Sequence, residues 1–548
     1  MEEEKVLKEF PDKQIIIDIP QKLEDGYRAG EPEWIIYKVP NKLRKIRPTA
    51  YTPQLVSIGP FHYGKSNLKA MEHYKTKYME AFLGRKFCTH IEVDNLTKFL
   101  EDENRLQRIQ GSYAVTLKPV NRSNKFRRRT SSLEMPAPAA ADEENKRNDF
   151  TRMILRDACF IFELFLRNHE TQLHKAHKEK LPAEIKDYSR DYILGSPWLK
   201  AAIKQDLILI ENQLPYFVLT ELFDHIVKEP SQNVNLLPYL QETKIENSLH
   251  RFVTKITCEF FTDYYKFGKP LPDLEESSQK TLPSTSDSNE TGQKNPGNMD
   301  LVTKLMTRAE NIKHFTDLIR ASMCEQRDYS NSSNNFTYCH YSAKQLDNAR
   351  VVFGSPEKAK FLADIETAWD HDRCWKNDPR CNCRNSCCGC WINGLCWINC
   401  LKLEIPPLTI EDKTECIFRN VMALEQFVYP NEPRICNYIF LLDQLISTVE
   451  DVDLLVDKKI IHNLLGSNKA VVDLVNKLCY EIVIDHFFYS DICKKLNDHR
   501  GKPLNVARST LRRVYFKDIW TGSSTLVGLV FLVFSGFSVA STIKNLLF

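Results

Sequence analysis

The feature that most constrains this chain is an uncharged stretch close to its C-terminus. From Ile519 to Ile543 the sequence reads IWTGSSTLVGLVFLVFSGFSVASTI, 25 residues without Asp, Glu, Lys or Arg. Such a run is long enough to cross a hydrocarbon core of about 30 Å as a helix, and buried core helices are seldom this long. We therefore predict a transmembrane helix over 519–543, followed by a short tail over 544–548.

The charges beside this helix predict its orientation. Lys544 alone follows it, whereas four basic residues precede it. These are Arg508, Arg512, Arg513 and Lys517. The positive-inside rule then places the large N-terminal part in the cytosol. The charged leader, 1–33, holds no apolar run long enough for a signal peptide. The prediction is a single-pass, tail-anchored protein, with the plasma membrane as the favoured location.

This orientation has consequences for cysteines and for glycosylation. Cytosolic thiols stay reduced, and sequons in a cytosolic body stay unused. The sequons are at Asn95, Asn121, Asn289, Asn331 and Asn335. A luminal body would reverse both predictions. Within the span, the small-residue pairs Ser524/Gly528 and Gly536/Ala540 would permit close helix approach and self-association.

The rest of the chain has the composition of a globular protein. Hydrophobic residues make up 42% and charged residues 27% of the 548 positions. The net charge of +3 supplies no general attraction to nucleic acid, so we expect no nucleic-acid partner. Two segments, about 118–148 and 269–299, hold too few apolar residues to offset their ordering entropy. We predict that both are disordered linkers.

Apolar spacing predicts helices over most of the remainder. Residues Leu68–Leu83 place apolar side chains at three- and four-residue steps, and Met153–Leu166 is apolar nearly all round. The stretch Asp206–Phe223 contains Pro215, which predicts two helical halves or a kink at Leu214. Further helices are predicted over Asp412–Phe427 and Tyr438–Leu465, with Gly466 as a C-cap. The expected fold class is mainly α, with one large helical domain over 34–517.

Seven motifs in order make the sequence recognisable. They are IYKVP at 36–40, AYTPQLVSIGPFH at 50–62, DACF at 157–160, LIENQLP at 209–215, LEIPPL at 403–408, RNVMALEQ at 419–426 and LGS at 465–467. Together with the C-terminal span, they resemble the plant "domain of unknown function 247" family. The resemblance implies a plant, membrane-associated, mostly helical protein, and no reaction. Some grass members are implicated in pollen-side self-incompatibility, which implies recognition work.

One segment departs from the family pattern. Residues 374–400, CWKNDPRCNCRNSCCGCWINGLCWINC, hold eight of the seventeen cysteines where the family has an ordinary apolar stretch. Four of them, Cys387, Cys390, Cys396 and Cys400, could supply thiolates to a tetrahedral zinc ion. The spacing also allows disulfides, a tryptophan-rich surface with lipidated thiols, or a loop peculiar to this chain whose thiols have none of these roles. These alternatives stay open.

A second candidate site is the P-loop pattern in SIGPFHYGKS at 57–66. Gly59, Gly64, Lys65 and Ser66 occupy the positions of a phosphate-binding loop. The interior does not suit that role, because Pro60 lacks an N–H donor and the residues at 61–63 are bulky. The family motif already explains both glycines. Nucleotide binding is therefore kept as an alternative function.

The remaining polar candidates lie inside apolar segments. They are Glu211, Asn212 and Gln213, then Asn420, Glu425 and Gln426. Buried polar groups usually join hydrogen-bond networks that fix packing, so we expect a structural role for them and for His62. The hypothesis is a non-enzymatic, membrane-anchored plant protein that recognises an unidentified protein partner or signals, without catalytic residues or a cofactor.

Overall fold

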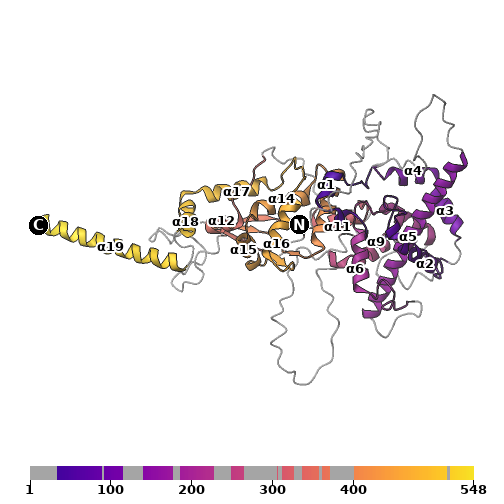
Figure 1. Ribbon diagram of the computed structural model, residues 1–548, viewed down its shortest axis with the longest axis horizontal. Coiled ribbons are helices and arrows are strands. Elements are labelled where there is room, and N and C mark those ends of the chain that lie inside the picture. The colour runs from indigo at the N-terminus through magenta and orange to yellow at the C-terminus, as the bar shows by residue number, and fades with distance from the viewer. Residues whose placement is uncertain are drawn as a thin grey trace, which may run out of the picture.

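The structure is a computed structural model of the chain. It describes residues 34–88, 92–114, 140–176, 185–227, 249–264, 305, 311–325, 336–356, 361–370, 400–514 and 519–547. The leader and the predicted linker at 269–299 lie outside these residues. Figure 1 shows most helices of the first half at one end, those of the second half in the middle with α1 and α11 beside them, and α19 extending from the other end.

The first half is a bundle of helices around α5. Its helices are α1 (Asn41–Ile46), α2 (Lys69–Leu83), α3 (Val93–Glu101), α4 (Glu103–Gly111), α5 (Ala140–Ala176), α6 (Pro197–Leu207), α7 (Tyr216–Val227), α9 (Leu249–Phe260) and α11 (Phe315–Met323), with 3-10 turns at Pro48–Tyr51, Ser66–Leu68 and Thr262–Tyr264. The stretch Met153–Leu166 lies in α5 and is buried on nearly every side, as predicted. Helices α2, α3 and α9 pack around it.

The second half combines helices with two small sheets. Its elements are α12 (Ala343–Asn348), β1 (Val351–Gly354), β2 (Glu366–Asp370), β3 (Cys400–Glu404), β4 (Leu408–Ile410), α13 (Thr414–Val428), α14 (Arg434–Leu445), α15 (Val449–Asp457), β5 (Ile461–Asn463), α16 (Asn468–Leu478), α17 (Ser490–Gly501) and α18 (Pro503–Val514). Side-chain caps set several starts, as where Ser467 accepts from the Ala470 N–H at 3.2 Å. The fold is mainly α, as predicted.

The two sheets join strands that are distant in sequence. Strand β3 pairs with β1 in parallel and with β2 antiparallel, and this register places Val351 opposite Leu401 and Phe353 opposite Leu403. All four side chains are buried, so alternate residues face the core. Strand β4 pairs with β5 in parallel. This pairing brings the LEIPPL motif beside the strand that precedes LGS.

Three predicted boundaries were wrong. The stretch Asp206–Phe223 is divided near Pro215, as predicted, but most of its first half is not helical, because α6 ends at Leu207 and α7 begins at Tyr216. The predicted helix over Tyr438–Leu465 is α14, α15 and β5, and Gly466 (φ +84°) forms the turn from β5 into α16 rather than a helix cap. The first predicted linker ends early, because its Ala- and Glu-rich residues 140–148 begin α5.

A buried ion pair connects α11, α13 and α14. Arg320 Nε donates to Glu425 Oε1 at 2.9 Å, and both side chains are buried. The Glu425 carboxylate also accepts the backbone N–H groups of Ile435 and Cys436 at the start of α14, at 2.9 and 2.8 Å from Oε2. A carboxylate at a helix N-terminus satisfies donors that have no partner within the helix. Glu425 therefore fixes α14 on α13.

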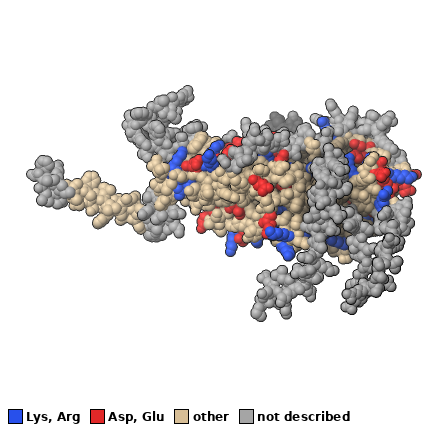
Figure 2. Space-filling view, turned by 90° about the horizontal axis from the view of Figure 1, so that it is seen from above, with Lys and Arg blue, Asp and Glu red and all other residues tan. Residues whose placement is uncertain are grey.

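Helix α19 (Ile519–Leu547) differs from every element above. Residues Ser523–Ser541 are long and apolar enough to cross a membrane, and none of this stretch is buried against the body. Large apolar side chains such as Phe531 and Phe537 are more than 70% exposed. In Figure 2 the described part of this helix shows no charged atoms, whereas the body shows both signs.

We predict that Arg320→Met lowers the free energy of unfolding by about 3–5 kcal/mol, because it leaves the Glu425 charge buried without its partner. Chemical unfolding of the full chain in detergent measures this loss. Lys42→Met is the control, since its pair with Glu481 is exposed and worth less than about 1 kcal/mol. Equal losses in the two variants would contradict the assignment.

Candidate functional site

The candidate functional site is a buried polar cluster that we call the polar junction. Its centre is Asp206, at the end of α6, with Glu211, Asn212 and Gln213 in the irregular segment that leads to α7. All four side chains are at most 2% exposed. They come from the LIENQLP motif and the residues just before it. The segment is irregular because its side chains replace the hydrogen bonds that a helix would make.

Gln213 joins the ends of two helices. Its Nε2 donates to the carbonyls of Leu207 and Leu209, at 2.5 and 2.8 Å, where α6 ends. Its Oε1 accepts the Phe315 N–H at 3.0 Å, where α11 begins. Free carbonyls at one helix end and free N–H groups at the other are thus satisfied by a single amide.

Asp206 and Asn212 hold an irregular segment, residues 54–58, that belongs to no helix or strand. The Asp206 carboxylate accepts the N–H groups of Gln54, Leu55 and Val56 at 2.7–2.9 Å. Asn212 Oδ1 accepts the Ile58 N–H at 2.7 Å, and its Nδ2 donates to the Val56 carbonyl at 3.0 Å. Burial raises the pKa of Asp206 to about 6, although the three N–H donors oppose the rise.

A third carboxylate, Asp157 of the DACF motif, extends this contact. It accepts the Gly59 N–H at 2.8 Å and pairs with the fully buried Lys75 of α2. The Lys75 ammonium also donates to the Ser57 carbonyl at 2.7 Å. Burial raises the pKa of Asp157, and the Lys75 charge opposes it. Residues 57–60, which we call the SIGP segment, are therefore bound between α5, α2 and the polar junction.

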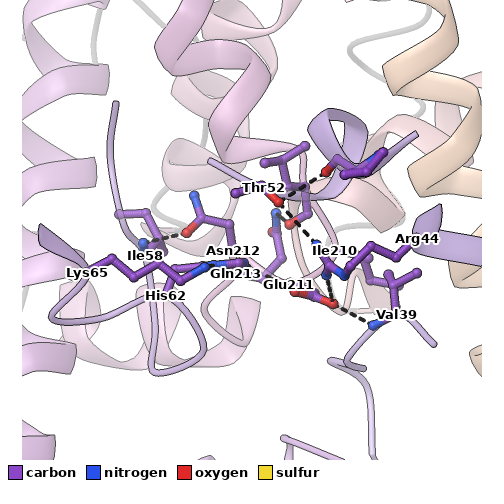
Figure 3. Close-up of polar contacts among 12 residues, drawn as sticks. Val39, Arg44, Thr52, Ile58, His62, Lys65, Ile210, Glu211, Asn212 and Gln213 are labelled. Carbon is purple, nitrogen blue, oxygen red and sulfur yellow. Dashed lines mark hydrogen bonds and ion pairs between the residues drawn. The ribbon is translucent and has the colours of Figure 1, made fainter. Parts of the chain in front are cut away.

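Glu211 carries a chain of polar contacts toward the surface (Figure 3). Its Oε1 accepts the Val39 N–H at 2.5 Å and pairs with Arg44 of α1. Its Oε2 lies 3.2 Å from His62 Nε2, and His62 Nδ1 lies 2.7 Å from the Lys65 ammonium. The order is Arg44, Glu211, His62 and Lys65, with Lys65 exposed.

The charges along this chain follow from its contacts. Burial lowers the pKa of His62, so its ring is neutral, with Nδ1 accepting from Lys65 and Nε2–H facing Glu211. Burial acts to raise the pKa of Glu211, but His62 and Arg44 outweigh it and hold that pKa below its ordinary value. The ionised Glu211 carboxylate therefore lies between two cations. It contacts Arg44 directly, and Lys65 through the neutral His62 ring.

Asn420 brings α13 into the junction. Its Oδ1 accepts the Ile210 N–H at 3.0 Å, and its Nδ2 donates to the Ala50 carbonyl at 2.7 Å. A compact apolar cluster surrounds this contact, formed by Val39, Leu43, Ala50, Tyr51, Leu209, Ile210, Cys416, Ala423 and Leu424. Five of the seven motifs, those beginning at 36, 50, 157, 209 and 419, therefore meet at one place.

The P-loop candidates are arranged differently from a phosphate cradle. No strand precedes Gly59 within the described residues 34–88, and the Gly59 N–H is bonded to Asp157. Lys65 contacts His62, and Ser66 begins a 3-10 turn ahead of α2. Gly59 has a conformational reason of its own, with φ +70° and a Cβ position 2.5 Å from the Gln213 carbonyl oxygen.

The cysteine candidates lie almost entirely outside the described residues. Cys387, Cys390 and Cys396 belong to the segment 371–399, so their zinc, disulfide or lipid chemistry stays a prediction. Cys400 begins β3, opposite Asp370. In the part of the chain that the structure describes, no group of three or more His, Cys, Asp or Glu side chains is placed to hold a metal ion.

Several junction residues were not singled out from the sequence. Asp206, Lys75 and Arg44 look like ordinary charged positions of helices, and Asp157 appeared only as a letter of its motif. The available signal was an acidic residue inside a stretch that is otherwise mostly apolar, as Asp157 and Glu163 are within Met153–Leu166. The partners themselves lie about 100 to 150 residues away, which local patterns do not report.

The fold and the junction define a class: a mainly helical protein whose distant motifs converge on a buried polar cluster, with an apolar helix outside the body. The chain belongs to the DUF247 family, described as plant proteins of unknown function, whose model matches residues 36–534. It is 24% identical over 503 residues to UPF0481 protein At3g47200 of Arabidopsis thaliana, covering 90% of this chain and 83% of that protein. No solved structure matches the chain.

We predict that Gly59→Ala lowers the free energy of unfolding by about 3 kcal/mol or more. The new Cβ would have to displace the Gln213 carbonyl, and an alanine would also be strained by the positive φ at this position. Gly64→Ala is the matched control. It has φ +77° but open space around it, and should cost about 1 kcal/mol. Urea unfolding measures the free energy of unfolding of both variants. If Gly64→Ala lowers it as much as Gly59→Ala does, the contact with the Gln213 carbonyl is not the cause.

A second prediction concerns His314, which caps α11. Its Nδ1 accepts the Asp317 N–H at 3.4 Å and its Nε2 faces the Ile35 carbonyl at 3.0 Å, so the ring is neutral. Burial lowers its pKa from 6.5 to about 4. The unfolded chain therefore takes up the proton first, and stability present above pH 6.5 is lost as the pH falls toward 4.

Titration of His314 should lower the free energy of unfolding by about 3 kcal/mol over this pH range. The variant His314→Asn keeps one acceptor and one donor without titrating, so its unfolding free energy should fall less between pH 6.5 and 4. His340→Asn, at an exposed position, is the control and should follow the wild type. Parallel pH profiles for wild type and His314→Asn would rule the effect out.

Proposed function

We propose that this protein is a single-pass membrane protein, anchored by α19, whose helical body recognises another protein on the cytosolic side. The observation that carries the proposal is α19 itself. Its apolar stretch Ser523–Ser541 makes no buried contact with the body, unlike a core helix of similar composition. Exposed apolar surface of this extent is unfavourable in water and favourable in a hydrocarbon core. The family match extends into this helix, to residue 534.

The orientation rests on charge. The basic residues Arg508, Arg512 and Arg513 lie in α18, and Lys517 follows it, so all four are on the body side of the apolar stretch. The positive-inside rule favours the cytosol for that side. A recognition role is favoured over catalysis because the polar residues of the junction are engaged with backbone groups of the chain itself. Exposed aromatic side chains such as Tyr192 and Trp198, which flank the start of α6, are of the kind that protein interfaces use.

Membrane anchoring is tested by two truncations that differ only in the span. A chain that stops before Ile519 should move from the membrane fraction to the soluble fraction after alkaline extraction. A chain that stops after Ile543 keeps the span and should stay in the membrane. If the first truncation partitions like the full chain, α19 is not the anchor.

The side of the membrane is tested by protease protection in sealed vesicles. The body should be digested from the cytosolic side without detergent, and Asn95, exposed on α3, should carry no glycan. A protected body with a glycan at Asn95 would place it in the lumen and overturn the orientation, while leaving the anchor itself intact.

A further inference from the structure

Two cysteines outside the polar junction face each other across a well-defined contact. The segment 336–341 lies along α17, held at both ends by side chains of that helix. The Thr337 N–H donates to Ser490 Oγ at 3.3 Å. Farther along, Asn497 Nδ2 donates to the Tyr338 carbonyl at 2.7 Å, and its Oδ1 accepts the His340 N–H at 3.1 Å.

The spacing of these anchors sets the position of Cys493. Residues 490, 493 and 497 are three and four positions apart, so they share one face of α17. Cys493 thus lies between the two anchor points, opposite Cys339. The Cys339 N–H is fixed in turn by Gln444 Oε1 of α14 at 2.6 Å. Three elements therefore hold the two thiols in contact.

The contact makes the two thiols unequal. The Cys493 S–H donates to the Cys339 sulfur, which lowers the pKa of Cys339 and raises that of Cys493. Burial raises the pKa of Cys88, Cys324 and Cys416 to about 12, so those thiols are inert by comparison. Cys339 lies just under the surface, between the exposed Tyr338 and His340, whereas Cys493 is fully buried.

We propose that Cys339 and Cys493 form a redox pair that closes to a disulfide by exchange with a low-molecular-weight disulfide of the glutathione type. The Cys339 thiolate attacks one sulfur of the oxidant and releases the first small thiol. Cys493 then loses its proton and attacks the Cys339 sulfur of the mixed disulfide, releasing the second small thiol. Two protein thiols are oxidised to one disulfide, and one small disulfide is reduced to two thiols.

A disulfide between Cys339 and Cys493 would act on the part of the body that leads to α19. It would tie the segment that precedes α12 to α17, and α17 continues into α18, the last body helix before α19 (Figure 1). Closure would restrain the end of the body nearest the span. The proposal goes beyond membrane anchoring and does not depend on it.

The test uses the full chain in detergent, purified reduced and then equilibrated in glutathione buffers of increasing oxidation. After free thiols are blocked, peptide mass spectrometry should find Cys339 linked to Cys493, and the Tm should rise on oxidation. Cys436→Ser, which alters a buried thiol elsewhere, should retain the link. Cys493→Ala should lose it completely, leave Cys339 as the glutathione mixed disulfide, and slow alkylation of Cys339 at pH 7 several-fold.

The wild-type peptide map alone can overturn the proposal, whether or not a variant folds. The proposal is wrong if both Cys339 and Cys493 are fully blocked by the alkylating agent at the most oxidising potential. It is also wrong if either of them is linked to a cysteine of the 374–400 segment instead.

Discussion

The rest of the structure depends on a set of backbone N–H groups that have neither a helix nor a sheet to bond to. Those of Gln54, Leu55, Val56, Ile58 and Gly59 are bonded to Asp206, Asn212 and Asp157 instead. Three of these N–H groups, those of Val56, Ile58 and Gly59, are fully buried. A buried N–H left without an acceptor costs about 1–3 kcal/mol, so these three amount to roughly 3–9 kcal/mol, a large part of a domain's stability. Side-chain acceptors 98 to 154 positions away are therefore what allow this segment to be buried at all.

The same contacts explain why the family motifs have the letters that they have. Gly59 must be glycine where the chain passes the Gln213 carbonyl with a positive φ. Gln213 spans the ends of α6 and α11, and Asn420 and Glu425 attach α13 to the junction and to α14. The polar letters of these motifs are thus bonded to backbone groups of the same chain. This use of carboxylates resembles anion binding by a loop, with the protein's own acidic side chains in the place of a phosphate.

Sequence patterns predicted what depends on local periodicity. The mainly helical class, the buried core of α5, helix α2 and helix α13 all follow from apolar spacing, and the structure confirms them. The pattern failed over 208–215, because Asn212 and Gln213 satisfy the backbone groups that a helix would have used, and over Tyr438–Leu465, where β5 pairs with the distant β4. The polar motif residues were recognised as a network, but its partners Asp206, Lys75 and Arg44 required tertiary contacts to be found. The orientation of α19 and the chemistry of the 374–400 cysteines stay predictions.

The central claim is that the polar junction and Asp157 hold residues 54–59 through side-chain acceptors. Amide hydrogen exchange in the intact chain tests this claim most directly. The N–H groups of residues 54–59 lie in neither helix nor strand, so a surface turn would exchange them within seconds. We expect the bonded N–H groups of Gln54, Leu55, Val56, Ile58 and Gly59 to exchange as slowly as the core of α5. We also expect Asp206→Asn to accelerate exchange at Gln54, Leu55 and Val56 more than at Gly59. Fast exchange of all of them in the wild type, at a rate typical of a solvent-exposed loop, would contradict it.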